Sequence, residues 1–219
     1  MNKTKTKTDK NSTALALNVV LVVLGIIGFI RTITGLGYPA WEYYTQLSNY
    51  FALISAAIYV VFLIRNIKDK SKEIPKWVSI LKYTSTLSLL VTFLVVVFIL
   101  TPYYGKDIII WIFFEGSNLF YHTLCPIITF ISFTFFESHN IKGIKDNFRA
   151  IYFTIAYAIV FITLNILKVY EGPYPFLMVY KQPVYMSIVW FILIVGGAFG
   201  IGKGIMWIKN KQENVKIEQ

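Results

Sequence analysis

The sequence contains a single cysteine, Cys125, and only two histidines, His122 and His139. One cysteine excludes an internal disulfide, and no CxxC pair or His/Cys spacing of the kind that binds zinc is present. We therefore expect no metal ion and no cofactor. We also expect no cleavable signal peptide, because the first apolar run is too long for the hydrophobic region of one.

Charged residues are scarce as well, at 15% of the 219 residues. Soluble domains typically have about 25% charged residues. Hydrophobic residues make up 56% of this chain and aromatic residues 17%. A soluble domain of this size cannot bury so much apolar surface in one core. The composition therefore predicts an all-α, polytopic integral membrane protein.

Six apolar runs are each long enough to cross a bilayer as a helix, which takes about 20 residues. The predicted spans are residues 14–33, 44–64, 80–101, 110–136, 150–167 and 184–208. Residues 14–208 would then form a six-helix transmembrane domain. We expect a disordered cytoplasmic tail at residues 1–13 and a second cytoplasmic tail at 209–219. Five glycines in the last run predict close helix packing in lipid: Gly196, Gly197, Gly200, Gly202 and Gly204.

The formal net charge of +10 comes from short basic clusters between the apolar runs. This distribution is typical of cytoplasmic loops and argues against a nucleic-acid-binding face. With six spans, seventeen of the 21 basic residues fall on one side, which places both termini in the cytoplasm of a cell membrane protein. That count includes Lys82 with the second loop and Lys209 with the C-terminal tail. Membrane lipids are the expected partners of the clusters.

Polar residues inside apolar runs are costly in lipid and therefore indicate function. His122 lies within the fourth run, whereas we expect His139 to be a solvated loop residue. Thr45, Ser48 and Asn49 stand at i, i+3 and i+4 near the start of the second run. They share one helix face, which must point into the bundle.

The second and fourth runs enter the bilayer from the same side, so the hydroxyl of Thr45 and the imidazole of His122 lie at similar depths. Such a pair can act as nucleophile and base, or simply join helices by hydrogen bonds. Asn118 precedes His122 by four residues and is expected to hold its ring. Cys125 follows by three and is either a second nucleophile or an inert small hydrophobe.

Three segments resemble the androgen-induced-gene family of multipass membrane hydrolases and its bacterial relatives. They are YTQLSN at residues 44–49, NLFYHTLCP at 118–126, and GPYPFL at 172–177. The second contains the family's His-Thr-x-x-Pro pattern within a helix, and the third is similar to its Tyr-Pro-Phe-Leu loop. The order of the motifs and the six spans agree with the family, so the resemblance covers most of the chain.

The resemblance implies an intramembrane hydrolase of lipid esters. Animal members cleave fatty acid esters of hydroxy fatty acids with a threonine and a histidine, and the motifs carry these roles onto Thr45 as nucleophile and His122 as general base. Asn49 or Asn118 would supply an oxyanion donor, and Tyr174 would cover the site. The expected substrate is a small lipid ester. Residues 48 and 49 differ in type from the animal pattern.

Other functions fit the same residues. The protein could instead be a non-enzymatic lipid-binding or scaffold protein, or an acyltransferase that uses Cys125. A third alternative is a small-solute transporter with His122 in a proton path. The lack of an acidic residue deep in any run, and of an internal repeat, counts against transport. The sequence leaves the oligomeric state open.

Overall fold

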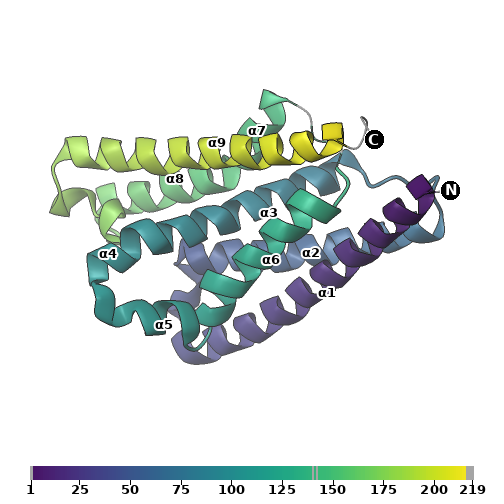
Figure 1. The fold of residues 1–219 in the computed structure, drawn as a ribbon. Coiled ribbons are helices and arrows are strands. Elements are labelled where there is room, and N and C mark those ends of the chain that lie inside the picture. Colours follow the sequence, from purple (N-terminus) through teal and green to yellow (C-terminus); the bar gives the residue numbers. More distant parts are fainter. Residues whose placement is uncertain (1, 140, 142, 216–219) are drawn as a thin grey trace.

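The computed structural model describes residues 2–139, 141 and 143–215, with side chains from residue 10 to residue 212. These residues form helices and no strand. Six helical segments are long and apolar enough to span a membrane: Lys10–Leu36, Tyr44–Lys68, Lys76–Tyr104, Leu119–Phe136, Ile144–Ile166 and Val184–Gln212. The predicted multi-pass, all-α fold is confirmed. The segments lie side by side, and the two ends of the chain lie at the same end of the bundle (Figure 1).

The first two spans form a tightly packed pair. Helix α1 (Asn2–Leu36) extends through the segment predicted as an irregular tail, so residues 2–13 are helical. A short 3₁₀ turn, η1 (Tyr38–Trp41), leads into α2 (Tyr44–Lys68). In α1, a Cβ added at Gly28 would collide with the ring of Tyr121. The absence of a side chain at Gly28 therefore lets the fourth span approach α1.

The third span is α3 (Lys76–Val95), a π turn at η2 (Val96–Leu100) and α4 (Thr101–Tyr104). Pro102 has no N–H to donate, which explains the loss of regular α hydrogen bonding before it. Lys82 lies in α3 with a completely buried side chain. Its assignment to a solvated loop was wrong, because an ion pair inside the bundle replaces water around its ammonium group.

The fourth run divides into two parts. Helix α5 (Ile109–Phe114) is separate, and the chain then turns at Gly116, which has a positive φ of 58°. The span itself comprises η4 (Leu119–Leu124), α6 (Cys125–Ile131) and η5 (Ser132–Phe136), with π turns in η4 and η5. The predicted single helix over 110–136 was therefore wrong at its start, because Gly116 breaks it.

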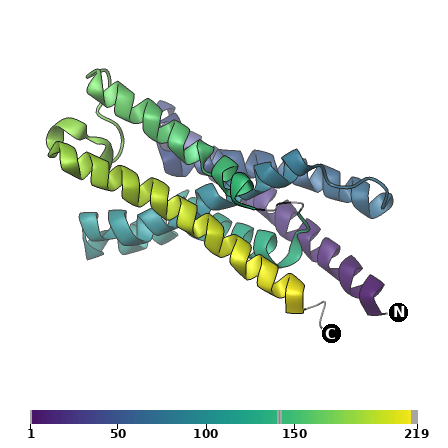
Figure 2. The same ribbon diagram turned by 90° about the horizontal axis from the view of Figure 1, so that it is seen from above.

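The last two spans lie against α3. The fifth consists of α7 (Ile144–Ala150) and α8 (Tyr152–Ile166), and a loop with the turns η6 (Pro175–Leu177) and η7 (Val179–Lys181) follows. Helix α9 (Val184–Val215) extends beyond the predicted boundary at residue 208 and lies along the outside of the bundle (Figures 1 and 2). Residues 1 and 216–219 of the predicted tails lie outside the described residues.

Only one of the five glycines in α9 makes the predicted close approach. A Cβ at Gly202 would collide with Asn147 and Tyr83, whereas the other four have open space around them. The prediction of close packing was wrong for Gly196, Gly197, Gly200 and Gly204. No atom of a neighbouring helix lies within 4 Å of a Cβ placed at any of these four positions, so none of them is a close helix contact.

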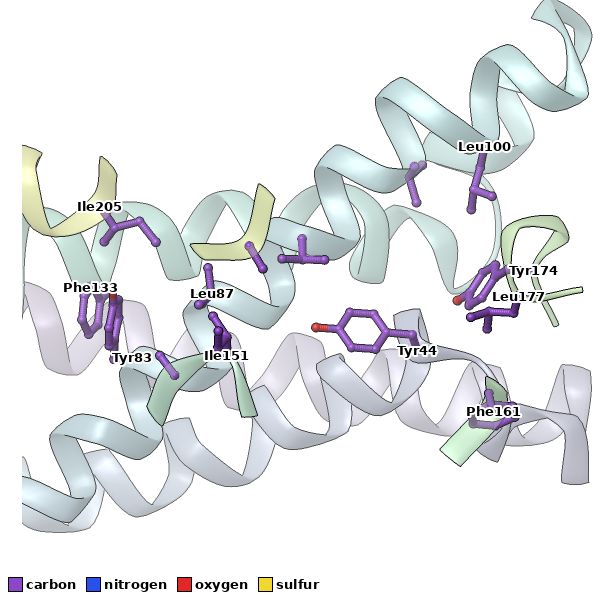
Figure 3. Packing of buried hydrophobic residues seen from close by; sticks show 14 of the residues in the cluster. Tyr44, Tyr83, Leu87, Leu100, Phe133, Ile151, Phe161, Tyr174, Leu177 and Ile205 are labelled. Carbon is purple, nitrogen blue, oxygen red and sulfur yellow. The ribbon is translucent and has the colours of Figure 1, made fainter. Parts of the chain in front are cut away.

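The main hydrophobic core follows α3 along the length of the bundle (Figure 3). At one end the rings of Tyr83 and Phe133 stack with centroids 5.5 Å apart. At the other end Tyr174 and Leu177 of the last loop lie below Leu100. This core therefore fixes the loop that contains Tyr174 against the first residues of α2.

Candidate active site

Thr45 is the second residue of α2, at the end of the bundle away from the chain termini. The first N–H groups of a helix have no partner within the helix. Here the backbone N–H of Thr45 donates to the hydroxyl of Tyr174 over 3.1 Å. The Tyr174 hydroxyl in turn lies 3.4 Å from Thr45 Oγ1, to which it donates. One tyrosine thus anchors both the backbone and the side chain of Thr45.

The loop that holds Tyr174 is fixed by hydrogen bonds. Asn165 of α8 donates to the carbonyl of Glu171 over 2.5 Å and accepts from the N–H of Val179 over 2.9 Å. The Tyr174 ring stacks on Phe176 and meets the Tyr43 ring edge-on. Burial raises the pKa of the Tyr174 hydroxyl, so it is a neutral donor at ordinary pH. Its predicted position over Thr45 matches the structure.

His122 is held by the end of α5. The last carbonyl groups of a helix have no hydrogen-bond donor within that helix. In α5, the carbonyl groups of Ile112 and Phe113 accept hydrogen bonds from side chains of η4. His122 Nδ1 donates to Ile112 over 2.8 Å, and Thr123 Oγ1 donates to Phe113 over 2.9 Å. Because a carbonyl only accepts, Nδ1 carries the proton and Nε2 is a free base. Nε2 is buried without a hydrogen-bond partner in the described structure.

The π turn of η4 explains how His122 reaches α5. Pro126 has no N–H, so the carbonyl of His122 has no α-helical donor four residues later. The N–H of Cys125 instead bonds to the carbonyl of Phe120, five residues before it. A wide turn of this kind rotates the side chains that precede it relative to a regular helix.

Thr45 and His122 line one cavity of about 550 Å³, which we call the Thr45 cavity. It lies among α1, α2, the end of the third span, α5 and the Tyr174 loop. Tyr174 and Asn118 also line it. Its wall combines polar side chains, such as Gln46 and Glu115, with apolar ones, such as Leu36 and Trp111. The two predicted catalytic side chains therefore share a cavity, as their depths in the sequence suggested.

Ser48 and Asn49 are buried with Thr45, as the predicted helix stripe requires, but their polar groups are already engaged. Ser48 bonds to Thr92 of α3 over 2.8 Å. The amide of Asn49 donates to the carbonyls of Thr45, over 2.7 Å, and Tyr121, over 3.1 Å. Both of its N–H groups are used, so the predicted role of Asn49 as oxyanion donor was wrong.

Asn118 does not have the position predicted for it relative to His122. Asn118 donates to the carbonyl of Trp111 over 3.1 Å, and Ile112 rather than Asn118 holds the imidazole. The π turn removes the regular i, i+4 relation on which the prediction depended. Cys125 is buried with Leu21 and Leu89 and does not line the Thr45 cavity, as expected of an inert hydrophobe.

Gln46 lines the Thr45 cavity, although no role was predicted for it from the sequence. It is buried beside Thr45, and Thr32 Oγ1 lies 3.4 Å from its amide oxygen. A hydroxyl that donates to this oxygen leaves the amide N–H groups for the cavity. The YTQLSN motif could have indicated Gln46 as a cavity residue, because Gln46 directly follows Thr45 in it. Arg31 and Glu115 are the charged residues of the cavity wall.

A second polar cluster lies at the opposite end of the fourth span, and we call it the inner cluster. Its members are Asn18, Lys82, Ser132, Glu137, His139 and Lys209. Glu137 Oε1 accepts from Ser132 over 2.6 Å and Asn18 over 2.8 Å, and Oε2 lies 3.1 Å from His139 Nε2. Lys209 donates to the Glu137 carbonyl over 2.6 Å. These contacts join α1, α3, η5 and α9.

The inner cluster corrects the prediction for His139. The side chain of His139 is completely buried rather than solvated. Burial lowers its pKa to about 4, although Glu137 opposes this. For Glu137, burial acts to raise the pKa, but Lys82 and His139 hold it at about 2. Glu137 directly follows the fourth span, so the prediction that no acidic residue lies deep in a run is not affected by its burial.

Comparison with protein families, with curated proteins and with solved structures finds no match to this chain. The likeness to the androgen-induced-gene family therefore stands on the three motifs alone. In the structure, residues of all three motifs line the Thr45 cavity: Thr45, His122 and Tyr174.

Proposed function

We propose that the protein is an intramembrane hydrolase of lipid esters, with Thr45 as nucleophile and His122 as general base. The observation that supports this most is that His122 lines the same cavity as Thr45 and that its Nε2 has no hydrogen-bond partner among the described residues. An imidazole whose other nitrogen is fixed by a backbone carbonyl has a defined tautomer, which is what a general base needs.

The reaction proceeds through an acyl-enzyme. Thr45 Oγ attacks the ester carbonyl carbon while its proton passes to His122 Nε2. The bond to the alcohol oxygen then breaks, and His122 returns the proton to that oxygen. In the second half, His122 takes a proton from water and the resulting hydroxide attacks the acyl-threonine. The bond between the acyl carbon and Thr45 Oγ then breaks, His122 returns the proton to Oγ, and the fatty acid is released.

The negative charge that develops on the carbonyl oxygen needs donors. The Tyr174 hydroxyl and the Gln46 amide both belong to the wall beside Thr45. The N-terminus of α2 adds a favourable dipole at the same place. Donors of this kind typically contribute about 10²- to 10³-fold in rate. Tyr174 thus has two roles, to position Thr45 and to stabilise the oxyanion.

The deciding experiment measures fatty acid release by the purified protein in lipid nanodiscs. Thr45→Ala and His122→Gln should each abolish release, whereas Thr45→Ser should retain it. Ser48→Ala and Cys125→Ala are matched controls, because neither side chain lines the cavity, and both should remain active. A hydroxyl-reactive phosphonate probe should label Thr45, as mapped by mass spectrometry. Bound lipid with no turnover in the wild type would replace this proposal with a lipid-binding function.

We place the Thr45 cavity at the extracytoplasmic side of the cell membrane, with both chain ends in the cytoplasm. The basic residues of the loop at residues 65–76 and of the chain ends support this orientation. A cysteine introduced at Gly105, in a loop at the cavity end, should react with a membrane-impermeant maleimide on intact cells. A cysteine at Lys70 should react only after the membrane is opened.

A further inference from the structure

A second space, which we call the apolar chamber, adjoins the Thr45 cavity. It lies among α2, α3, α8 and α9 and has a free volume of about 50 Å³. One water molecule occupies about 30 Å³ in the liquid, so the chamber by itself holds only a small part of a ligand. Thr45 and Tyr174 line both spaces and thus stand between them.

The chamber offers little to a polar ligand, because its polar groups bond to the protein. Tyr44 bonds to Thr154 over 2.8 Å, and Tyr157 donates to the carbonyl of Glu42 over 2.7 Å. Thr92 bonds to Ser48 over 2.8 Å. The remaining wall consists mainly of aliphatic and aromatic side chains, among them Val95, Trp190 and Ile194. Such a wall favours a hydrocarbon occupant.

The chamber continues outward toward the membrane. A groove of about 270 Å³ lies between α3 and α9, and Val91, Val95 and Ile194 line both the groove and the chamber. Its outer edge includes Phe98 and Leu193, whose exposed fractions are 70% and 52%. In a membrane-spanning helix, exposed apolar side chains of this kind face lipid acyl chains. The groove therefore opens into the hydrocarbon region.

We infer that the apolar chamber and the α3–α9 groove bind the acyl chain of the ester, with the ester carbonyl at Thr45 and the alcohol part in the Thr45 cavity. The substrate enters sideways from the bilayer between α3 and α9. This inference depends on the proposed hydrolase function and adds a substrate class: esters of long, unbranched fatty acids. Short acyl groups fill the chamber but do not extend into the groove.

Gly197 provides the test. It lines the groove, and a Cβ at this position would meet nothing within 4 Å, so a side chain there fills the groove without disturbing the fold. Gly200 is one turn along the same helix, is equally open, and does not line the groove. Gly197→Leu and Gly200→Leu change helix propensity equally, which makes them a matched pair.

The measurement is kcat/KM for para-nitrophenyl palmitate and para-nitrophenyl butyrate in nanodiscs. In Gly197→Leu the palmitate-to-butyrate ratio should fall by about tenfold, equivalent to the loss of about two buried methylene groups. In Gly200→Leu the ratio should match the wild type. An unchanged ratio in active Gly197→Leu would overturn the acyl-chain site and leave the hydrolase proposal intact. A wild type that cleaves neither ester would instead overturn the hydrolase proposal.

A binding measurement tests the site without turnover. Thr45→Ala protein is irradiated with a diazirine-bearing palmitate analogue, and the attachment sites are mapped by mass spectrometry. Labels should fall on chamber and groove residues such as Val95 and Ile194, and should decrease in the Thr45→Ala, Gly197→Leu double variant. Labels spread over the outer faces of α1 and α8, with none in the chamber, would contradict the inference.

Discussion

The Nζ of Lys82 lies 3.7 Å from Oε1 of Glu137, and both side chains are completely buried. Lys82 lies in the third span and Glu137 directly follows the fourth, so their ion pair connects these two spans. A buried charge without its partner is strongly unfavourable. The pair thus fixes the alignment of these two spans at the inner cluster. This cluster lies at the end of the fourth span opposite to His122.

Replacing Lys82 by methionine should destabilise the protein by about 3 kcal/mol, because Glu137 remains buried without its cation. Lys72→Met is the control. Lys72 pairs with Asp69 at 3.5 Å on an exposed loop, and loss of such a pair costs at most about 1 kcal/mol. Unfolding of the detergent-solubilised protein in a denaturant series measures both. A Lys82→Met, Glu137→Gln double variant that is no more stable than Lys82→Met alone would contradict the coupling.

Stability should decrease as the pH falls below about 6.5. The pKa of His139 is lowered by burial from 6.5 to about 4 in the folded protein, so folding favours its neutral form. That contribution is fully present above pH 6.5 and is lost as the pH falls toward 4, by an amount on the order of 2–3 kcal/mol. This loss of stability is measured as the decrease in the thermal unfolding midpoint when the pH is lowered from 7.5 to 4.5.

The control for this pH dependence is His139→Phe. The ring of His139 stacks on Phe133 with centroids 4.2 Å apart, so phenylalanine keeps the stacking and removes the titration. The variant should show a flatter midpoint over the same pH range. Glu137 contributes with the same sign, but mainly below pH 4.5, because its pKa is lowered from 4.5 to about 2. An equal slope in His139→Phe and wild type would refute the assignment to His139.

Tyr174→Phe should lower kcat for ester hydrolysis by at least about tenfold, because the hydroxyl that contacts both the N–H and Oγ1 of Thr45 is lost. The stacking on Phe176 remains, so the loop should stay in place. Tyr43→Phe is the matched control, since it removes another hydroxyl from the same cavity wall. Equal kcat in the two variants would show that Tyr174 does not act on Thr45.

Gly28→Ala should destabilise the protein by about 1–3 kcal/mol, because the added methyl group collides with the ring of Tyr121. Gly35→Ala in the same helix meets nothing within 4 Å and should be neutral or slightly stabilising. Denaturant midpoints of the two variants provide the comparison. A Gly28→Ala protein as stable as Gly35→Ala would mean that α1 and the fourth span do not pack as closely as described.

The membrane-spanning fold could be predicted from the sequence, because runs of about 20 apolar residues form helices in lipid whatever their neighbours are. The sequence also identified Thr45, His122 and Tyr174 as polar groups in an apolar setting. The cost of a polar group in lipid is a local property and can be read from the chain.

The hydrogen-bond partner of each polar group could not be predicted in this way, because it depends on how the helices pack. Helix periodicity placed Asn118 beside His122, but a π turn and a separate α5 give that position to the carbonyl of Ile112. Lys82 and His139 resembled loop charges in the sequence, and the structure buries both with Glu137. Hydrogen bonds and ion pairs between helices depend on the rotation and depth of each span, which long-range packing sets and a local pattern does not contain.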